Sequence, residues 1–411
     1  MQVTITRTID LPDRLTTIKE LEEEVLEFGR SIMKEVMRLA WRRCQWAEMR
    51  CERCGSEGVT KEGHTPYSVH TLFGEVELAR QKVHCWSCRR YSHPLDGRLR
   101  ELRGHATEDF KELAVLSAAS WPYAQAAHVL KKATGSAVSH EQVRLLAGEE
   151  GRAAAKEQLG EAQAIVDGEA EVPEVETEMV IVGLDGGWVR SLDNKEGMEG
   201  KVAVVYQGSE QVGKERRELV GRRLAATFQG SEVIGKLCYK EAARQGVEGA
   251  RKKAVLGDGA VWISEVAGEH FPDAKRILDL WHLEKRLSEA LRSSLAEGER
   301  EVIRQRLKEK LKHGKVGEAL LELKALLTVH PDDRLREFLG YVENNAQWIG
   351  DYERLQAEGY PVGSGPVEKG VDIVINRRMK GHRGMRWPRC TAGLEAPQRG
   401  WHHCPQSPPS Q

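Results

Sequence analysis

Four absences restrict what this sequence can encode. No apolar run in its 411 residues approaches the roughly 18–20 residues that a membrane-spanning helix needs. The N-terminal stretch MQVTITRTIDLPDRL has no basic-then-apolar pattern of a secretion signal. These absences predict a soluble cytoplasmic protein. The length predicts two to four domains, because a single core stops growing at roughly 250–300 residues.

Charge of one sign is also lacking, since the formal net charge is −1. Composition alone therefore does not indicate a nucleic-acid-binding protein. The basic residues are nevertheless concentrated in two blocks, with seven Lys or Arg from Arg80 to Gly104 and six, without any acid, from Asn376 to Arg389. Such blocks attract polyanions even in a neutral chain. DNA binding, with localisation at the nucleoid, and ordinary solvated surface are both consistent with them.

A disulfide framework is the fourth missing feature. Four of the eight cysteines form two CxxC pairs separated by thirty residues: Cys51, Cys54, Cys85 and Cys88. In a cytoplasmic chain this spacing favours a structural Zn²⁺ over a disulfide or an unliganded redox pair. An alternating hairpin, Tyr67–Leu72 and Glu75–Val83, lies between the pairs. Residues 51–104 are therefore predicted to form a zinc ribbon, with the four nearby histidines, His64, His70, His84 and His93, at the surface.

Helical patterns flank the ribbon. Residues 1–50 are predicted to be an N-terminal helical segment, because apolar residues recur at spacings of three and four. Residues 105–150 carry three helices and a Gly-containing turn, which matches a helix-turn-helix. The recognition helix would present His140, Gln142 and Arg144 to DNA, while a plain helical linker remains the alternative. The acidic, Pro-containing stretch 151–178 is predicted to be a linker.

The remaining chain has an α/β pattern. In residues 179–282, three strands precede a helix–strand–helix–strand order, which predicts a mixed sheet. Residues 283–358 have a helical pattern and are predicted to form a helical insertion. Residues 359–387 lead through a glycine loop into a final helix that starts near Pro366. Residues 388–411 change abruptly to Pro, Gly and polar residues, which predicts a disordered or frameshifted tail.

Carboxylates stand where the predicted strands end. Asp185, Asp258 and Asp279 each follow an apolar run, and Glu368 lies at the start of the final helix beside the second basic block. Converging carboxylates bind hard divalent cations. Each acid taken singly is more simply a helix cap or a turn former. Three of them at strand ends, joined by Glu368, favour a metal-dependent nuclease site.

In order, these residues resemble the motifs of prokaryotic insertion-sequence transposases with an RNase H-like DDE catalytic domain, in the group close to Mutator-like elements. The resembling segments are GLDGGWV, VLGDGAVWI, DLWH and VGSGPVEKGVDIVINRRMKGHRGMRW. The upstream ribbon and helix-turn-helix also fit. The resemblance covers about residues 40–387. Relatives continue in helix beyond this point, so the tail puts the activity of this chain in question.

The resemblance implies roles for individual residues. Asp185, Asp258 and Glu368 would be catalytic and hold Mg²⁺ or Mn²⁺, and Asp279 with His282 would be accessory. The partners would be the terminal inverted repeats of the element, target DNA and further copies of the chain in a homo-oligomer. Phosphates would be contacted by Arg377, Arg378, Lys380 and Arg383. The alternatives are a non-catalytic or decayed DNA-binding regulator derived from a transposase, and an RNase H-like nuclease without transposition.

Overall fold

The computed structural model of the chain describes residues 4–9, 17–47, 49–100, 105–193, 195–214, 217–381 and 386–387. The chain divides into two compact units, Met1–Glu150 and Gly151–Gln411. The predicted tail, residues 388–411, lies outside the described residues, and so does Arg383. None of the helices described is long and apolar enough to cross a membrane.

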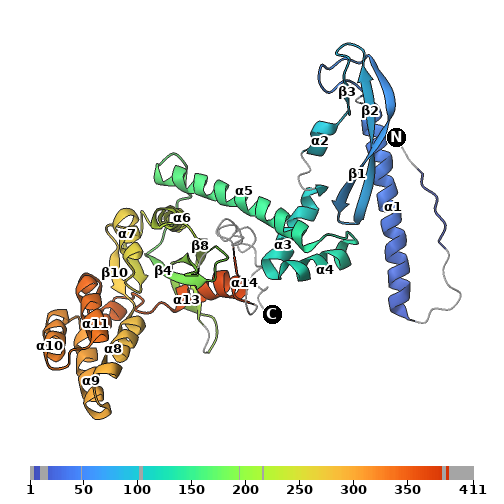
Figure 1. Cartoon of the computed structure of the whole chain (residues 1–411). Helices are drawn as coiled ribbons and strands as arrows, with labels where there is room; N and C mark the ends of the chain where they lie inside the picture. The colour runs from blue at the N-terminus through green and yellow to red at the C-terminus, as the bar shows by residue number, and fades with distance from the viewer. Residues whose placement is uncertain are drawn as a thin grey trace. The chain divides into compact units, whose positions relative to one another are not determined.

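The first unit is built on a long antiparallel hairpin and one helix (Figure 1). Strands β1 (Val59–Thr71) and β2 (Gly74–Cys85) pair from end to end, and the short β3 (Tyr91–Ser92) joins β2. Helix α1 (Ile18–Ala47) lies along β2, with Met37 and Trp41 packed against the small core of the hairpin. The short α2 (Asp96–Arg100) follows β3. Both strands are longer than the pattern predicted.

Three helices follow: α3 (Glu108–Ser120), α4 (Tyr123–Thr134) and α5 (His140–Val166), of which α5 continues past the last residue of this unit. Gly135 ends α4 in the left-handed region at φ 77°, which glycine adopts without steric cost. Phe110, Leu130 and Val143, one from each helix, share a core. The predicted linker, residues 151–178, is helical in its first part, because α5 continues to Val166. The run of alanines there favours helix, and Ala162 is buried in the core of the second unit.

A five-stranded mixed sheet organises the second unit. Its order is β10-β9-β4-β5-β8, and the bounds are β4 Met179–Val189, β5 Met198–Tyr206, β8 Arg223–Thr227, β9 Lys252–Gly257 and β10 Lys275–Leu278. Strands β4, β5 and β8 are antiparallel neighbours, whereas β9 and β10 return parallel to β4. The sequence pattern missed a small hairpin, β6 (Gly208–Gln211) and β7 (Arg217–Val220), because these short exposed strands lack an alternating apolar pattern.

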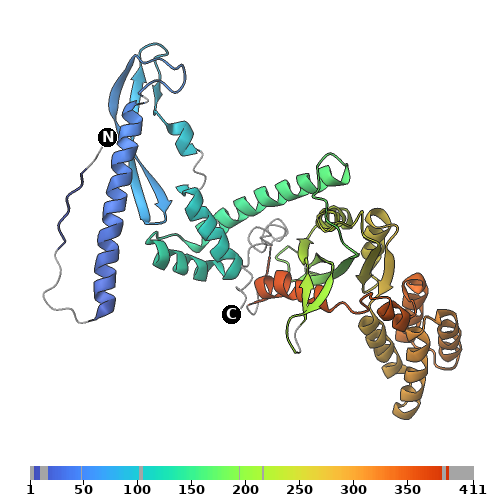
Figure 2. The same cartoon turned by 180° about the vertical axis from the view of Figure 1, so that it is seen from behind.

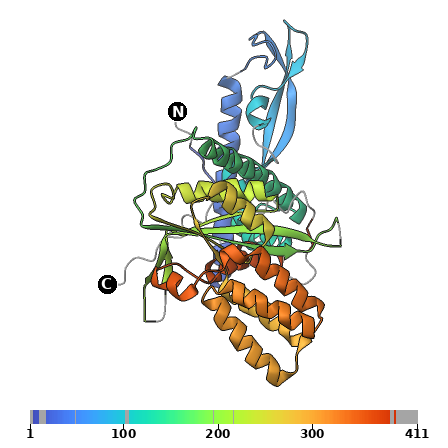
Figure 3. The ribbon, with the colours of Figure 1, turned by 90° about the vertical axis from the view of Figure 1, so that its left-hand side faces the viewer.

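Helices cover both faces of this sheet (Figure 3). Val180, Val182 and Leu184 of β4 share a core with α6 (Ser231–Ala243) and α7 (Val261–His270). On the other face lies a continuous helical segment made of α13 (Gly365–Val371), the π-helical turn η3 (Asp372–Asn376) and α14 (Arg377–Met379). A Cβ at Gly183 would lie 3.2 Å from the Cβ of Val367, so glycine in β4 lets α13 approach the strand closely.

The helical insertion forms a group of its own beside the sheet (Figure 2). It comprises α8 (Leu280–Ser294), α9 (Glu297–Lys312), α10 (Val316–Val329), α11 (Asp333–Asn344), the 3₁₀ turn η2 (Ala346–Trp348) and α12 (Tyr352–Ala357). Its buried leucines, such as Leu287, Leu307 and Leu335, join the core cluster of the sheet. Tyr352 is fully buried and donates a hydrogen bond to the carbonyl of Leu278 at 3.0 Å. The insertion therefore supports the ends of β9 and β10.

Candidate functional site

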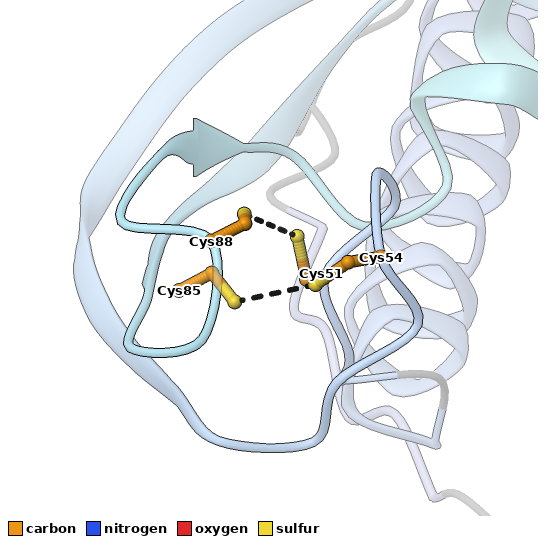
Figure 4. A group of neighbouring side chains, drawn as sticks. All are labelled: Cys51, Cys54, Cys85 and Cys88. Atoms are coloured by element: carbon orange, nitrogen blue, oxygen red, sulfur yellow. Dashed lines mark hydrogen bonds between the residues drawn. The ribbon is translucent and has the colours of Figure 1, made fainter.

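Four cysteines meet at the end of the hairpin, as the sequence spacing predicted (Figure 4). The sulfurs of Cys51, Cys54, Cys85 and Cys88 all lie within 4.8 Å of one another. The Sγ atoms of Cys51 and Cys88 are 3.7 Å apart, and those of Cys54 and Cys85 are 3.6 Å apart. A tetrahedral Zn²⁺ with S–Zn bonds of about 2.3 Å has sulfurs about 3.8 Å apart. The cluster therefore has the dimensions of a structural zinc site.

Backbone N–H groups lower the pKa of the first thiol in each CxxC pair, Cys51 and Cys85. Burial alone would raise the pKa of the Cys51 thiol, but backbone N–H groups of Cys54 and Arg53 donate to the sulfur and lower the pKa to about 6. A residue with positive φ follows each pair: Gly55 at 73° and Arg89 at 55°. The two turns thus have the same shape, and the second places a non-glycine residue in the left-handed region.

Three of the four histidines near this cluster are less exposed than expected. His64 is exposed, whereas His84 and His93 are half-buried. His70 is buried and its ring stacks on Phe110 at 5.7 Å. His70 is buried because it lies at the end of β1, where three successive residues are buried and the hairpin meets α3.

Three aspartates stand level across the sheet of the second unit. Gly183 of β4 pairs with Leu256 of β9, so Asp185 and Asp258, each two residues further on, are level. Leu278 of β10 pairs with Gly257, which brings Asp279 level with Asp258. β9 and β10 end directly before Asp258 and Asp279, as predicted, whereas Asp185 lies inside β4, which continues along β5 to Val189. The chain therefore gathers these acids from three neighbouring strands.

Asp185 lies between Gly183 and Gly187 on the face of β4 that α13 and η3 cover. A Cβ at Gly187 would lie 2.9 Å from Cγ1 of Val371. Burial and the charges of Asp258 and Glu368 together raise the pKa of Asp185 to about 6, against the lowering effect of the Gly186 N–H. Asp258 and Glu368 are thus both close enough to Asp185 to act on its charge.

Asp279 is fully buried and links three segments. Its Oδ1 accepts hydrogen bonds from the backbone N–H of His282 at 2.6 Å and from the Nδ1 of His282 at 3.0 Å. Its Oδ2 accepts from the backbone N–H of Ser364. Desolvation opposes the ionised form, but these donors keep the pKa of Asp279 below its usual range. Asp279 is therefore the N-cap of α8, and it also connects α8 to the loop before α13 through a hydrogen bond.

His282 presents its second ring nitrogen away from Asp279. The hydrogen bond with Asp279 raises the pKa of His282, and the charges of Asp279, Asp258 and Asp185 raise it further against burial. The ring is therefore near the two strand aspartates. Its orientation is fixed on one side by Asp279 and on another by Trp281, which meets it edge to face at 4.9 Å.

Glu368 is the fourth residue of α13, one position later than the sequence predicted. Its Oε1 accepts a hydrogen bond from the hydroxyl of Ser364 at 3.0 Å. Ser364 therefore contacts Asp279 through its backbone and Glu368 through its side chain. A Cβ at Gly370 would lie 2.7 Å from Cγ2 of Val204, so glycine again allows the helix to sit close to the sheet. The Ser364 contacts hold Glu368 at the acidic edge.

Two residues of this site were missed at the sequence level. Arg286 lies 4.0 Å from Oδ2 of Asp258, and its guanidinium stacks on Tyr341 at 4.4 Å. The hydroxyl of Tyr341 donates to the carbonyl of Asp258 at 2.9 Å. Arg286 follows His282 by one helical turn on α8, so the i, i+4 spacing could have identified it. Tyr341 comes from the insertion and carried no comparable signal.

Among the described residues, only the four cysteines form a group whose ligand atoms all lie within 4.8 Å of one another. The carboxylates of Asp185, Asp258 and Glu368 therefore do not all lie that close together. Like charges repel, and Ser364 and Arg286 each draw one carboxylate toward themselves.

The predicted recognition residues lie at the start of α5. His140 is exposed. Gln142 and Ser139 form the predicted capping box, with hydrogen bonds of 2.8 and 3.1 Å. Arg144 makes two hydrogen bonds to Glu141, at 2.9 and 2.6 Å. Two of the three candidates are thus engaged by neighbours on their own helix.

The second basic block is only partly exposed. Arg377 and Lys380 are exposed, and Arg377 donates to Asp372 at 3.1 Å. Arg378 is half-buried with its guanidinium 5.3 Å over the ring of Trp387, and burial lowers its pKa to about 10. Trp387 donates its indole N–H to the carbonyl of Met379 at 3.0 Å and pairs with the chain just after β4. Arg378 therefore contributes to packing at the end of α14.

Comparison with known proteins gives one description that spans nearly the whole chain. No curated protein sequence matches it. Residues 11–389 match the uncharacterised protein family UPF0236, and the chain belongs to that family.

Proposed function

We propose that the chain is a DDE-type transposase, which cleaves DNA at the ends of an insertion sequence and joins the freed ends to target DNA. One observation carries the proposal: Asp185 and Asp258 stand level on adjacent strands, and Glu368 is near enough to raise the pKa of Asp185. The sheet supports it as well. Three antiparallel strands followed by two that return through helices is the arrangement expected of an RNase H-like core.

The donor set suits a hard divalent cation. Asp185 is partly buried beside two further carboxylates, and its burial together with their charges raises its pKa, so a bound cation would stabilise its ionised form. Asp185, Asp258 and Glu368 would hold Mg²⁺ or Mn²⁺. When bound, such ions activate the attacking hydroxyl and stabilise the leaving oxygen in an in-line phosphoryl displacement.

The reaction balances without an external energy source. In cleavage, a water oxygen bonds to phosphorus and the bond from phosphorus to the 3′-oxygen breaks, which leaves a 3′-hydroxyl and a 5′-phosphate. In strand transfer, that 3′-hydroxyl attacks a target phosphodiester and displaces the target 3′-oxygen, which takes up a proton. Strand transfer forms one phosphodiester bond for the one that it breaks, whereas cleavage consumes one water for each bond that it breaks.

Several further residues would position the third carboxylate, the attacking hydroxyl and the DNA. Asp279 holds His282 and Ser364, and Ser364 holds Glu368, so this chain of contacts keeps the third carboxylate beside the strand aspartates. His282 orients the attacking hydroxyl. Arg286 would bind the phosphate beside Asp258, while Arg377 and Lys380 contact the DNA backbone further along α14.

The first unit is the proposed DNA-binding part. The four-cysteine ribbon gives it a rigid end through structural Zn²⁺. The helices α3, α4 and α5 would act as a helix-turn-helix that recognises the terminal repeats, with His140 at the exposed start of the recognition helix. The long basic side chains in and after β2 would add phosphate contacts.

The proposal is tested with supercoiled DNA that carries the terminal repeats flanking the coding sequence of this chain. The purified chain is incubated with it in Mg²⁺, in Mn²⁺ or in EDTA, and strand breaks are mapped. We expect nicks at the repeat ends in either metal and none in EDTA. Asp185→Asn, Asp258→Asn and Glu368→Gln should each reduce cleavage by at least about 10³-fold, because each removes a ligand charge.

Asp273→Asn is the matched control, since it removes an aspartate charge at the opposite end of β10, where Asp273 pairs with Lys253 at 2.8 Å. This variant should cleave like the wild type. Specific binding to the repeats without cleavage in any metal would contradict the enzyme and favour a DNA-binding regulator. Cleavage that survives all three site substitutions would remove these acids from the chemistry.

A further inference from the structure

Helix α1 carries an apolar stripe that has no partner in the described first unit. The stripe consists of residues spaced three or four apart: Ile18, Leu21, Val25, Phe28, Ile32, Val36 and Leu39. Three of them are strongly exposed, Ile18 at 81%, Val25 at 54% and Val36 at 48%. Such a spacing sustained over about three heptads is typical of a two-helix coiled coil.

The stripe faces away from the hairpin. The residues of α1 that contact β2 include Lys34, Arg38 and Trp41. At about 100° per residue, these lie about half a turn around the helix from the stripe. Residues 4–9 approach one edge of it, where Arg7 pairs with Glu35 at 3.6 Å. Val25 and Val36 stay exposed beside that contact.

Charge is distributed unevenly along the same helix. Its first ten residues include five glutamates, Glu20, Glu22, Glu23, Glu24 and Glu27, and no arginine. The rest of the helix contains four arginines, Arg30, Arg38, Arg42 and Arg43. Two such helices side by side in the same direction would set acid against acid and base against base. An antiparallel pair would set the acidic part of each copy against the basic part of the other.

One register satisfies both patterns. If Ile32 lies on the two-fold axis, Val25 faces Leu39 and Phe28 faces Val36 of the other copy. Glu24 then faces Arg42 on the same flank of the stripe, and both of these side chains are exposed in the single chain. An isologous contact of this kind closes at two copies.

We propose that α1 forms an antiparallel two-helix coiled coil with α1 of a second copy of this chain. The charges of α1 complement those of a second, antiparallel α1. This complementarity identifies a second copy of the chain as the partner that covers the stripe. The dimer does not depend on the carboxylates of the second unit, so its success or failure is independent of the cleavage proposal.

The test compares the solution mass of the full chain with that of two charge-matched variants. Light scattering on a sizing column at micromolar concentration should give about twice the 46.1 kDa of one chain. Val25→Glu/Ile32→Glu places two acids in the stripe and should give the single-chain mass. Leu26→Glu/Met33→Glu changes two exposed apolar residues about 100° away on the same helix, and it should remain dimeric.

Folding of each variant is checked by circular dichroism and by zinc content, so that a misfolded first unit is recognised. A wild-type chain of single mass would overturn the proposal. Equal masses for the wild type and the stripe variant would also overturn it, because the dimer contact would then lie elsewhere.

Orientation is tested by charge reversal. Glu24→Arg and Arg42→Glu should each raise the dimer dissociation constant severalfold, and the double variant should restore it, because the reversed charges meet again in an antiparallel pair. In a parallel pair, like residues face each other and the double variant would gain nothing over the single ones. Absence of recovery would therefore overturn the antiparallel arrangement.

Discussion

The buried carboxylate of Asp279 accepts a hydrogen bond from the backbone N–H of Ser364, which lies 85 positions later in the chain. This contact joins the end of β10 to the start of α13, the helix that carries Glu368. The position of the third carboxylate therefore depends on a residue that does not itself need to touch a metal ion. The resemblance treated Asp279 as accessory, and this contact explains physically how an accessory residue can be needed.

Asp279→Ala should destabilise the second unit by about 2–4 kcal/mol, because it leaves the buried N–H groups of Ser364 and His282 without their acceptor. The matched control is Asp332→Ala at the N-cap of α11, where the side chain accepts one backbone N–H, from Leu335 at 3.0 Å. An ordinary cap of this kind contributes about 1 kcal/mol. Urea unfolding measures both, and equal losses would show that the Ser364 contact adds nothing.

Asp185→Asn should stabilise the metal-free protein at pH 7.5 by about 1–2 kcal/mol, after allowance for solvent screening. The folded-state pKa of Asp185 is raised to about 6, so its ionised form opposes folding above that pH. As the pH falls through 6 toward 3.8 the carboxyl becomes protonated and the penalty disappears. The difference between variant and wild type should therefore shrink at pH 5.

Thermal unfolding in EDTA at pH 7.5 and pH 5 measures this difference. A variant less stable than the wild type at pH 7.5 would contradict the prediction, as would a difference that is the same at both values. Added Mn²⁺ should raise the stability of the wild type at pH 7.5 and not that of the variant, because the cation needs the ionised carboxylate.

Arg89→Gly should stabilise the ribbon by about 1 kcal/mol, because a non-glycine residue pays a steric penalty in the left-handed region. Arg89 has φ 55° after the second CxxC pair, where the first pair has Gly55 at φ 73°. The reciprocal change, Gly55→Ala, should destabilise the ribbon by a similar amount. Competition with a chromophoric chelator measures the Zn²⁺ affinity of both variants. A lower Zn²⁺ affinity in Arg89→Gly than in the wild type would contradict the prediction.

Glu141→Gln should strengthen DNA binding severalfold, because it releases Arg144 from the ion pair at the start of α5 and removes a negative charge from the proposed recognition helix. Fluorescence anisotropy with terminal-repeat DNA at two salt concentrations measures the change. Glu112→Gln makes the same charge change at an exposed position on α3. If both variants gain equally, net charge rather than Arg144 accounts for the effect.

Several structural features that depend on residues close together in the sequence were predicted correctly from local patterns. The strand Met179–Val189 and the helix Val261–His270 have the predicted bounds, because apolar runs and turn residues mark their ends. The cysteine cluster also followed from spacing. The extension of α5 past Glu150 was missed, since its acidic residues suggested a linker while its alanines favoured helix.

Contacts between distant segments could not be predicted in the same way. Ser364 appeared as part of a glycine loop, and its two hydrogen bonds depend on how the helical insertion returns the chain to the sheet. Tyr341 reaches Asp258 only because α11 packs on α8. The burial of Arg378 under Trp387 depends likewise on the chain turning back toward the end of β4.

Val367 packs closely on Gly183, although the helix that carries Val367 is synthesised long after the strand that carries Gly183. Synthesis delivers the three strand aspartates first, then the whole helical insertion, and Glu368 only afterwards. A nascent chain that has reached the insertion thus has its aspartates but not yet Glu368. Under the proposed function, the cleavage site would be complete only after the DNA-binding unit and the core sheet had been synthesised.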